Sequence, residues 1–217
     1  MVATAGPAAG WGGVCPVAER KKTMRKEVYV DISARHVHLR PQDVETLFGP
    51  GAELTLRGQD NFMGGSVYTQ RVEIQGPKGS IPKVTILGPL RKYIQVEVSA
   101  TDARKLGIPA VVRESGPQNH EGTPGCRIVG PCGSIEIQQG VIAAHRHIHM
   151  TPQDAADAGV QAGDIVAIRI SGTGRETIYK DVSVSQTNSS HTAVHIDTDE
   201  ANAAGMPGAM MGELIVD

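Results

Sequence analysis

The sequence has few of the residues that mark several common classes of protein. Only 3% of its 217 residues are aromatic, and the chain has 3 cysteines and a formal net charge of −2 at pH 7. No apolar run approaches the roughly 18 residues that a membrane-spanning helix needs. A charge so close to neutrality gives no basic surface for the phosphates of a nucleic acid. We therefore expect a protein that binds neither nucleic acid nor membrane and whose cores are aliphatic.

The cysteines and the first residues indicate where the folded part begins and where the protein acts. Cys15, Cys126 and Cys132 are odd in number, and the last two do not have a usual zinc spacing. Nothing resembles a secretory signal, so we expect free thiols in a reducing compartment. Residues 1–26 are rich in glycine, proline and alanine and hold the only tryptophan, Trp11. We interpret them as a flexible leader.

From residue 27 onward the pattern is that of short strands and short helices. Runs of alternating or β-branched residues are separated by turns, and the chain has 26 glycines and 13 prolines. The segment TPQD at residues 151–154 offers an N-cap, a first-turn proline and an acid, and Gly159 can end that helix. Residues 101–107 and 198–205 repeat the pattern. The sequence predicts a mainly β fold with short helices, arranged as two β-barrel domains.

An internal repeat relates the two predicted domains. Residues 35–43 read RHVHLRPQD and residues 146–154 read RHIHMTPQD, with six of nine positions identical. Because each copy falls in its own half of the chain, we expect the first domain over residues 27–125 and the second over residues 126–217.

The repeat continues beyond these segments. QVEVSATDARKLG (95–107) aligns with AVHIDTDEANAAG (193–205) when the final glycines are superposed. The alignment places Glu97 opposite His195, at a polar position between two apolar ones. Each half therefore has an H-x-H pair and one further residue that can bind a metal.

The H-x-H spacing has a physical meaning only on a strand. Side chains at i and i+2 of a strand point to the same face, with Cα atoms about 6.5 Å apart, so two imidazoles can bind one metal. On a helix the same positions diverge by about 200°. Histidines can also cap turns or lie hydrogen-bonded in a core, but two copies, each with a third ligand, favour metal binding. The predicted ligand sets are His36, His38 and Glu97, and His147, His149 and His195.

These sets predict two divalent metal ions. Zinc is the leading candidate because its catalytic sites combine three protein ligands with one open position. A carboxylate ligand also admits iron, cobalt or manganese.

The remaining histidines carry weaker signals. His145 precedes His147 by two residues, but Ala34 occupies the corresponding position in the first copy. We interpret His145 as a neighbour of the ligands or an exposed residue, which leaves open which two of the three adjacent histidines bind the second metal. His120 and His191 lie in polar, loop-like stretches and are expected to be solvated.

A basic residue lies close to the first predicted metal. Arg91 follows a Gly-Pro turn and shortly precedes Glu97 in the sequence. Its guanidinium can hold phosphate or carboxylate through a fork of donors, or it can be a surface arginine paired with an acid. Lys92 is expected to face solvent. The sequence contains no nucleotide phosphate loop and no serine-nucleophile motif.

Five ordered segments closely resemble the PduL-type phosphotransacylases, or phosphate propanoyltransferases: SARHVHL, LGPLRKYIQVEVSATDARKLGI, GTPGCRIVGP, GVIAAHRHIHMTPQDA and HIDTDEANAAG. The likeness covers about residues 28–217. It implies a pair of β-barrel domains and a two-metal site, usually zinc. It also implies the reversible reaction of acyl-CoA, such as propanoyl- or acetyl-CoA, with inorganic phosphate to give acyl phosphate and CoA.

The resemblance also implies roles for single residues. The set that contains Glu97 would bind the first metal, whose open position takes the CoA sulfur, and the set that contains His195 would bind the second. Arg91 matches the phosphate-binding arginine of the family. Ser33 falls where the family carries a serine beside the first histidine pair, and we assign it to the active-site lining.

Location and partners follow from the same resemblance. Many family members act inside bacterial microcompartments, so we expect the lumen of such a compartment or the cytoplasm. Shell proteins or co-encapsulated enzymes would then be further partners, although the leader does not look like the amphipathic targeting helix of the family. Strand edges on small barrels favour a homo-oligomer.

Two alternatives remain open at the level of sequence. A cysteine-nucleophile acyltransferase would use Cys126 or Cys132, which lie in the turn-rich stretch GTPGCRIVGPCGS. No histidine is evidently paired with either thiol. A non-catalytic metal-binding scaffold module would need the metals but would not need Arg91.

Overall fold

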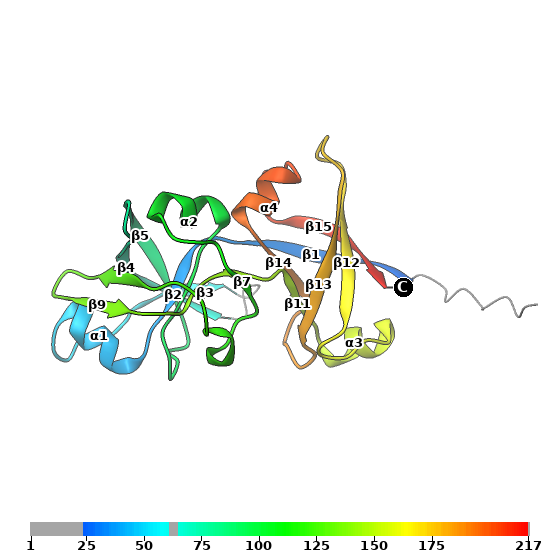
Figure 1. Cartoon of the computed structure of the whole chain (residues 1–217). Coiled ribbons are helices and arrows are strands. Elements are labelled where there is room, and N and C mark those ends of the chain that lie inside the picture. Colours follow the sequence, from blue (N-terminus) through cyan, green and yellow to red (C-terminus); the bar gives the residue numbers. More distant parts are fainter. Residues whose placement is uncertain (1–23, 61–64, 217) are drawn as a thin grey trace, which may run out of the picture.

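The computed structural model describes residues 24–60 and 65–216, which form two β-rich units beside one another (Figure 1). Most of the expected leader, with Trp11 and Cys15, lies outside the described residues. Its last residues belong to the fold, because the first strand begins at Met24. In the part of the chain that the structure describes, no helix has the length and apolar character needed to cross a membrane.

The first unit is a curled, open sheet. Its strands follow the order β7-β10-β6-β2-β5-β4-β8-β9, and β3 pairs with β4. These strands are β2 (His36–His38), β3 (Leu56–Asp60), β4 (Gly65–Gln75), β5 (Ser80–Leu87), β6 (Gln95–Glu97), β7 (Val112–Arg113), β8 (Cys126–Val129), β9 (Ser134–Ile137) and β10 (Val141–Ala144). The short helices of this unit are α1 (Pro41–Phe48), α2 (Ala100–Leu106) and the 3₁₀ turn η1 (Pro117–Asn119).

The second unit is a closed barrel with the strand order β1-β14-β11-β13-β12-β15. Its strands are β1 (Met24–Ser33), β11 (His147–His149), β12 (Ile165–Ile170), β13 (Thr177–Gln186), β14 (Ala193–Asp197) and β15 (Met210–Val216), and its helices are α3 (Pro152–Ala158) and α4 (Thr198–Ala203). The predicted mainly β class with two β units is confirmed. The second unit closes into a barrel, whereas the first is a curled half-barrel.

Local sequence explains the elements and their cores. Strand β12 alternates so that Val166, Ile168 and Ile170 are buried in the barrel, and each such side chain contributes roughly 1.5–3 kcal/mol on burial. Helix α3 begins as predicted, with the Thr151 hydroxyl accepting a hydrogen bond from the first turn. It ends at Gly159, whose φ of 66° is in the left-handed region. Both cores are almost entirely aliphatic.

The two units exchange strands at their junction. Strand β1 lies in the barrel, parallel to β14, and the chain then passes directly to β2 in the open sheet. Strand β10 lies in the open sheet, parallel to β6, and leads to β11 in the barrel. The strands are therefore divided differently from the expected ranges 27–125 and 126–217. Strands β8 and β9 also lie in the expected second range but belong to the open sheet. Alternation predicts where a strand is but not which strand it pairs with, so it could not place these four strands.

Equivalent ion pairs secure the two crossings. Arg35, just before β2, lies 2.8 Å from Asp102 of α2. Arg146, just before β11, lies 2.5 Å from Glu200 of α4. These four residues occupy matching positions in the repeat, so the internal symmetry extends to the contacts at the junction.

Candidate active site

The first predicted ligand set comes together on two paired strands. Strands β2 and β6 are antiparallel, with His36 opposite Glu97 and His38 opposite Gln95. Glu97 Oε2 lies 3.4 Å from His36 Nε2, and Glu97 Oε1 lies 3.8 Å from His38 Nε2. All three side chains are buried, and the atoms that could bind a metal lie within 4.8 Å of one another.

The second set repeats this construction in the barrel. Strands β11 and β14 are antiparallel, with His147 opposite His195. The ring of His195 lies 5.1 Å from that of His147 and 4.8 Å from that of His149, centroid to centroid. Their donor atoms also lie within 4.8 Å of one another. The structure thus brings together the six residues that the repeat alignment selects, in two groups of three.

Backbone carbonyls orient three of these imidazoles. A carbonyl oxygen only accepts, so the ring nitrogen that contacts it carries the hydrogen and the other nitrogen keeps its lone pair. In each case the anchored atom is Nδ1, which leaves the lone pair of Nε2 available to a metal. The carbonyl partners are those of Ala34 for His36 (2.9 Å), Leu87 for His38 (3.0 Å) and His145 for His147 (2.8 Å).

Electrostatics keep these groups in the forms that bind cations. Burial, followed by neighbouring positive charges, lowers the pKa of His38 to about 3 and that of His149 to about 3. Burial by itself would raise the pKa of Glu97, but the surrounding imidazoles, chiefly His36, hold that pKa well below its usual range. At neutral pH, His38 and His149 are therefore neutral and Glu97 is ionised. Burial opposes a charge on His36, but the Glu97 carboxylate beside it raises the pKa of that ring.

Two buried nitrogen atoms test whether metals fit. His36 Nε2 and His195 Nε2 are buried and have no hydrogen-bond partner among the described residues. A buried polar atom without a partner costs about 1–3 kcal/mol, which a bound cation would offset. The donor set, five imidazoles and one carboxylate, also suits zinc and similar divalent ions. The residues therefore fit two divalent metals.

Asp31 lies beside His195 of the second group, and the sequence pattern did not predict this contact. Its carboxylate lies 3.6 Å from His195 Nδ1, on the side of the ring away from Nε2. At this distance the pair is an electrostatic contact and not a hydrogen bond, and a carboxylate behind the ring favours the orientation in which Nε2 faces the other candidate ligands. Asp31 reaches this position because β1 pairs with β14, in the register that sets Asp31 beside His195. Only that pairing, which crosses between the halves of the chain, reveals the contact.

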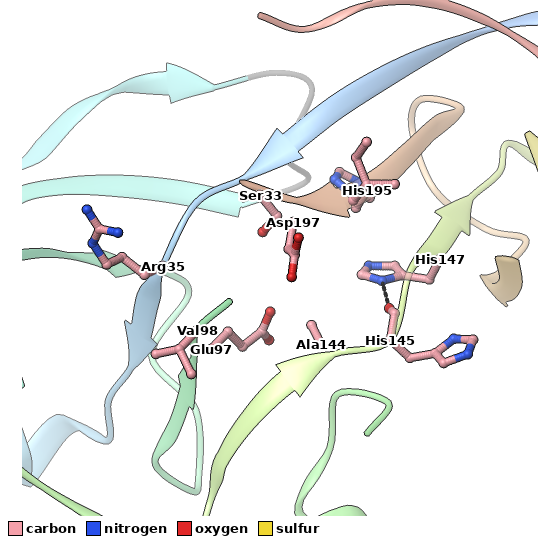
Figure 2. Close-up of a pocket in the computed structure, with 10 residues that line it drawn as sticks. Ser33, Arg35, Glu97, Val98, Ala144, His145, His147, His195 and Asp197 are labelled. Atoms are coloured by element: carbon pink, nitrogen blue, oxygen red, sulfur yellow. Dashed lines mark hydrogen bonds between the residues drawn. The ribbon is translucent and has the colours of Figure 1, made fainter. Parts of the chain in front are cut away.

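Both groups face one pocket. In addition to the six candidate ligands, its lining includes Ser33, Leu87, Arg91 and Ser115. Figure 2 shows a second pocket that shares four of these lining residues: Glu97 from the open sheet and His147 and His195 from the barrel point toward the same space, with Ser33 at its edge. Groups from opposite units are thus held around a common cavity.

Arg91 lies in this pocket with donors available to a ligand. Its Nη1 atom donates to the Tyr93 hydroxyl at 3.0 Å and to the Ser115 hydroxyl at 3.2 Å. Across residues 24–60 and 65–216, no carboxylate oxygen lies within 4.0 Å of its guanidinium nitrogens, so it is not a surface arginine paired with an acid. Lys92 is exposed, as expected.

His145 lies outside the second group. Its ring points away from Glu97, and its backbone carbonyl accepts a hydrogen bond from the His147 ring (Figure 2). Strand β10 ends at Ala144 and β11 begins at His147, so strand alternation does not run through His145. His145 is therefore not among the three histidines whose donor atoms converge.

One of the histidines expected to be solvated is buried. His191 is exposed, as predicted, but His120 is only 6% exposed, and the prediction for it was wrong. Its Nε2 lies 3.0 Å from the Gln95 side-chain oxygen. The polar residues around His120 predict a solvated loop, but the segment folds back onto β6, where His120 contacts Gln95.

Comparisons with known proteins agree with this geometry. The sequence model of the phosphate propanoyltransferase family matches residues 29–207. The phosphate propanoyltransferase of Thermotoga maritima is 46% identical over 190 residues, which cover 87% of this chain and 90% of that protein. That of Lachnoclostridium phytofermentans is 49% identical over 179 residues, 82% of each chain. That of Salmonella typhimurium is 45% identical over 181 residues, 83% of this chain and 85% of that protein.

The matched region includes both three-residue groups, Arg91 and Ser33, and the relatives are acyltransferases by name. The chain therefore belongs to the phosphate propanoyltransferase family of enzymes.

Proposed function

We propose that this enzyme transfers a short acyl group, propanoyl or acetyl, reversibly between CoA and inorganic phosphate at a two-metal site. The observation that carries the proposal is the common pocket, which both three-residue groups face together with Arg91. A structural metal site has no need for an arginine without a carboxylate partner at its mouth. The proposed ligands of the protein are therefore acyl-CoA and phosphate.

In this proposal each unit supplies the ligands of one metal. His36, His38 and Glu97 would hold the first, and His147, His149 and His195 the second. Bound there, divalent metals would supply Lewis acidity for the thioester carbonyl and for the departing thiolate of CoA.

The chain itself positions the phosphate. The Arg91 guanidinium holds the phosphate through charge-assisted hydrogen bonds, with the Ser33 and Ser115 hydroxyls beside it. A phosphate oxygen attacks the thioester carbon, a C–O bond forms, the C–S bond breaks, and CoA leaves with the electron pair on sulfur. Dianionic phosphate is already nucleophilic, so no general base and no covalent acyl-enzyme are required. Holding both reactants in one pocket lowers the barrier by roughly 7 kcal/mol or more.

The pocket lining favours a small acyl group. Leu87 is the aliphatic residue among the side chains that line the pocket, and the rest are polar. One methylene in an apolar contact is worth about 1–3 kcal/mol, so discrimination between the propanoyl and acetyl groups is limited to about 10–200-fold. A comparison of acetyl-, propanoyl- and butanoyl-CoA would rank the acyl groups.

The direct test is phosphate-dependent release of CoA. Purified protein is incubated with propanoyl-CoA, and free thiol is titrated with and without inorganic phosphate. We expect release only when phosphate is present, with acyl phosphate formed in equal amount and about two metals per chain by elemental analysis. Release without phosphate would instead indicate a hydrolase, and no release would contradict the proposal.

The cysteine-nucleophile alternative makes a different prediction. Cys126 is 6% exposed, burial raises the pKa of its thiol to about 12, and neither Cys126 nor Cys132 lines the pocket. We expect a thiol reagent at pH 8 to label exposed Cys132 quickly and Cys126 only after denaturation. Cys126→Ala and Cys132→Ala should both keep activity within about twofold of the unaltered enzyme. Loss of turnover in either variant, with the fold retained, would favour the cysteine route.

A further inference from the structure

A buried polar residue lies directly behind the first group. Gln95 is 0% exposed, on β6, opposite His38. In the repeat alignment its counterpart is Ala193, which lies opposite His149 in the barrel and is also buried. The barrel shows that an apolar residue suffices at this position for the fold. A buried amide costs free energy unless it is fully hydrogen-bonded, so its presence in one half points to a role there.

The contacts of Gln95 fix which end of its amide is which. The backbone N–H of Gly116 donates to one terminal atom at 3.0 Å, which must therefore be the oxygen. The other terminal atom lies 2.7 Å from Glu97 Oε1 and 2.7 Å from the Ser115 hydroxyl, so it is the nitrogen, and each of its two hydrogens has an acceptor. Both hydrogens of the Gln95 amide nitrogen therefore have acceptors, and its oxygen accepts a hydrogen bond.

His120 reinforces this orientation of the Gln95 amide. Its Nε2 lies 3.0 Å from the Gln95 oxygen, which can only accept, so Nε2 carries the hydrogen. Burial lowers the pKa of His120, which keeps the ring neutral with this one N–H. If the amide turned over, two N–H donors, from His120 and Gly116, would face an NH₂ group.

Two sets of contacts connect Gln95 and His120 to Arg91. Ser115, which receives a hydrogen bond from Gln95, also receives one from Arg91 Nη1. Tyr93, whose hydroxyl receives the other hydrogen bond from Nη1, packs edge-on against the His120 ring with centroids 5.6 Å apart. These five residues form a closed ring of contacts on one side of the pocket.

We infer that Gln95 and His120 are positioning residues, which hold the Glu97 carboxylate and the Arg91 guanidinium at a fixed separation. This inference rests on the proposed function, in which Glu97 binds a metal and Arg91 binds phosphate. A fixed separation matters because the phosphate oxygen must meet the thioester carbon, and a displacement of about 1 Å can cost roughly a hundredfold in rate. His120 touches neither substrate nor metal in this arrangement and acts only through Gln95.

His120→Phe tests the inference, because phenylalanine keeps the ring beside Tyr93 but has no N–H. We expect kcat/KM for phosphate to fall about tenfold or more, with KM for acyl-CoA little changed, and metal to be lost to a chelator about tenfold faster. His120→Gln, which retains a side-chain N–H donor, should restore most of both values. His191→Gln is the matched control on an exposed histidine and should change neither.

Gln95→Glu is the second variant and tests the inference if His120→Phe fails to fold. It keeps an acceptor for His120 and Gly116 but places an oxygen against Glu97, so we expect faster metal loss and a higher KM for phosphate. Wild-type metal retention and wild-type KM for phosphate in a folded variant would overturn the inference. Metal retention can be measured without turnover, so it tests the positioning role of Gln95 and His120 even if the unaltered protein is inactive. Absence of phosphate-dependent CoA release from the unaltered protein would overturn the proposed function instead.

Discussion

Removal of divalent metal with a chelator is expected to lower phosphate-dependent CoA release by at least about a thousandfold. Among the described residues, the side chains that line the pocket include no cysteine, and no hydrogen bond joins its serines, Ser33 and Ser115, to a histidine or a carboxylate. Arg91 is the arginine among them, and no lysine lines the pocket. The chain alone therefore offers little to stabilise negative charge on the carbonyl oxygen or on sulfur. Loss of Lewis acidity worth about 4 kcal/mol corresponds to a factor of about a thousand. The measurement is the initial rate of thiol release before and after dialysis against the chelator.

Adding metal back to the chelated protein tests whether the loss of activity is due to the metal. Activity should return with zinc, and a series with cobalt, manganese and iron would identify the preferred ion. The metal-bound protein should also unfold at a higher temperature than the chelated protein, because a ligand that binds only the folded state stabilises it. A chelated, metal-free sample that keeps full activity would refute the two-metal proposal.

Replacement of Arg91 is expected to have the second largest effect. Arg91→Ala should lower kcat/KM for phosphate by at least about a hundredfold, because two charge-assisted hydrogen bonds are each worth about 1.5–3 kcal/mol. The loss should be mostly in KM for phosphate if the arginine binds phosphate equally in the ground and transition states. Arg91→Lys should recover only part of the activity, since an ammonium cannot reproduce the fork of donors. Steady-state kinetics with phosphate and acyl-CoA varied in turn provide the measurement.

The neighbouring lysine is a matched control for charge. Lys92→Ala removes the same formal charge from the adjacent, exposed position and should leave both KM values unchanged. Metal content should be unaffected in both variants, because neither residue belongs to the three-residue groups. Equal effects of Arg91→Ala and Lys92→Ala would mean that general electrostatic attraction, not a specific contact, governs phosphate binding.

Periodicity and internal repetition were enough to select the six candidate ligands. An H-x-H pair on a strand has one geometric meaning, and the alignment of Gly107 with Gly205 then found Glu97 and His195 without knowledge of the fold. The structure sets each of these two residues opposite the first histidine of its pair. Ligands that lie on adjacent strands of a repeat can therefore be found from sequence.

The supporting residues could not be found in this way. Asp31 contacts His195 through a pairing of strands from opposite ends of the chain. His120 reaches Gln95 because its segment folds back over β6, and no periodic pattern signals such a return. Both contacts depend on long-range topology, whereas alternation and capping report only on neighbours in the sequence.

Strand β1 of the first half lies in the barrel and strands β8, β9 and β10 of the second half lie in the open sheet, so each half of the polypeptide completes the sheet of the other. A chain of half this length could build such a centre only as an intertwined pair of identical molecules, and its two metal sites would then be alike. Covalent linkage of the halves removes that restriction. It allows one group of candidate ligands to include a carboxylate beside a buried glutamine, while the other has three imidazoles beside an alanine. Two ions held by these groups, as proposed, would therefore differ in electrophilicity.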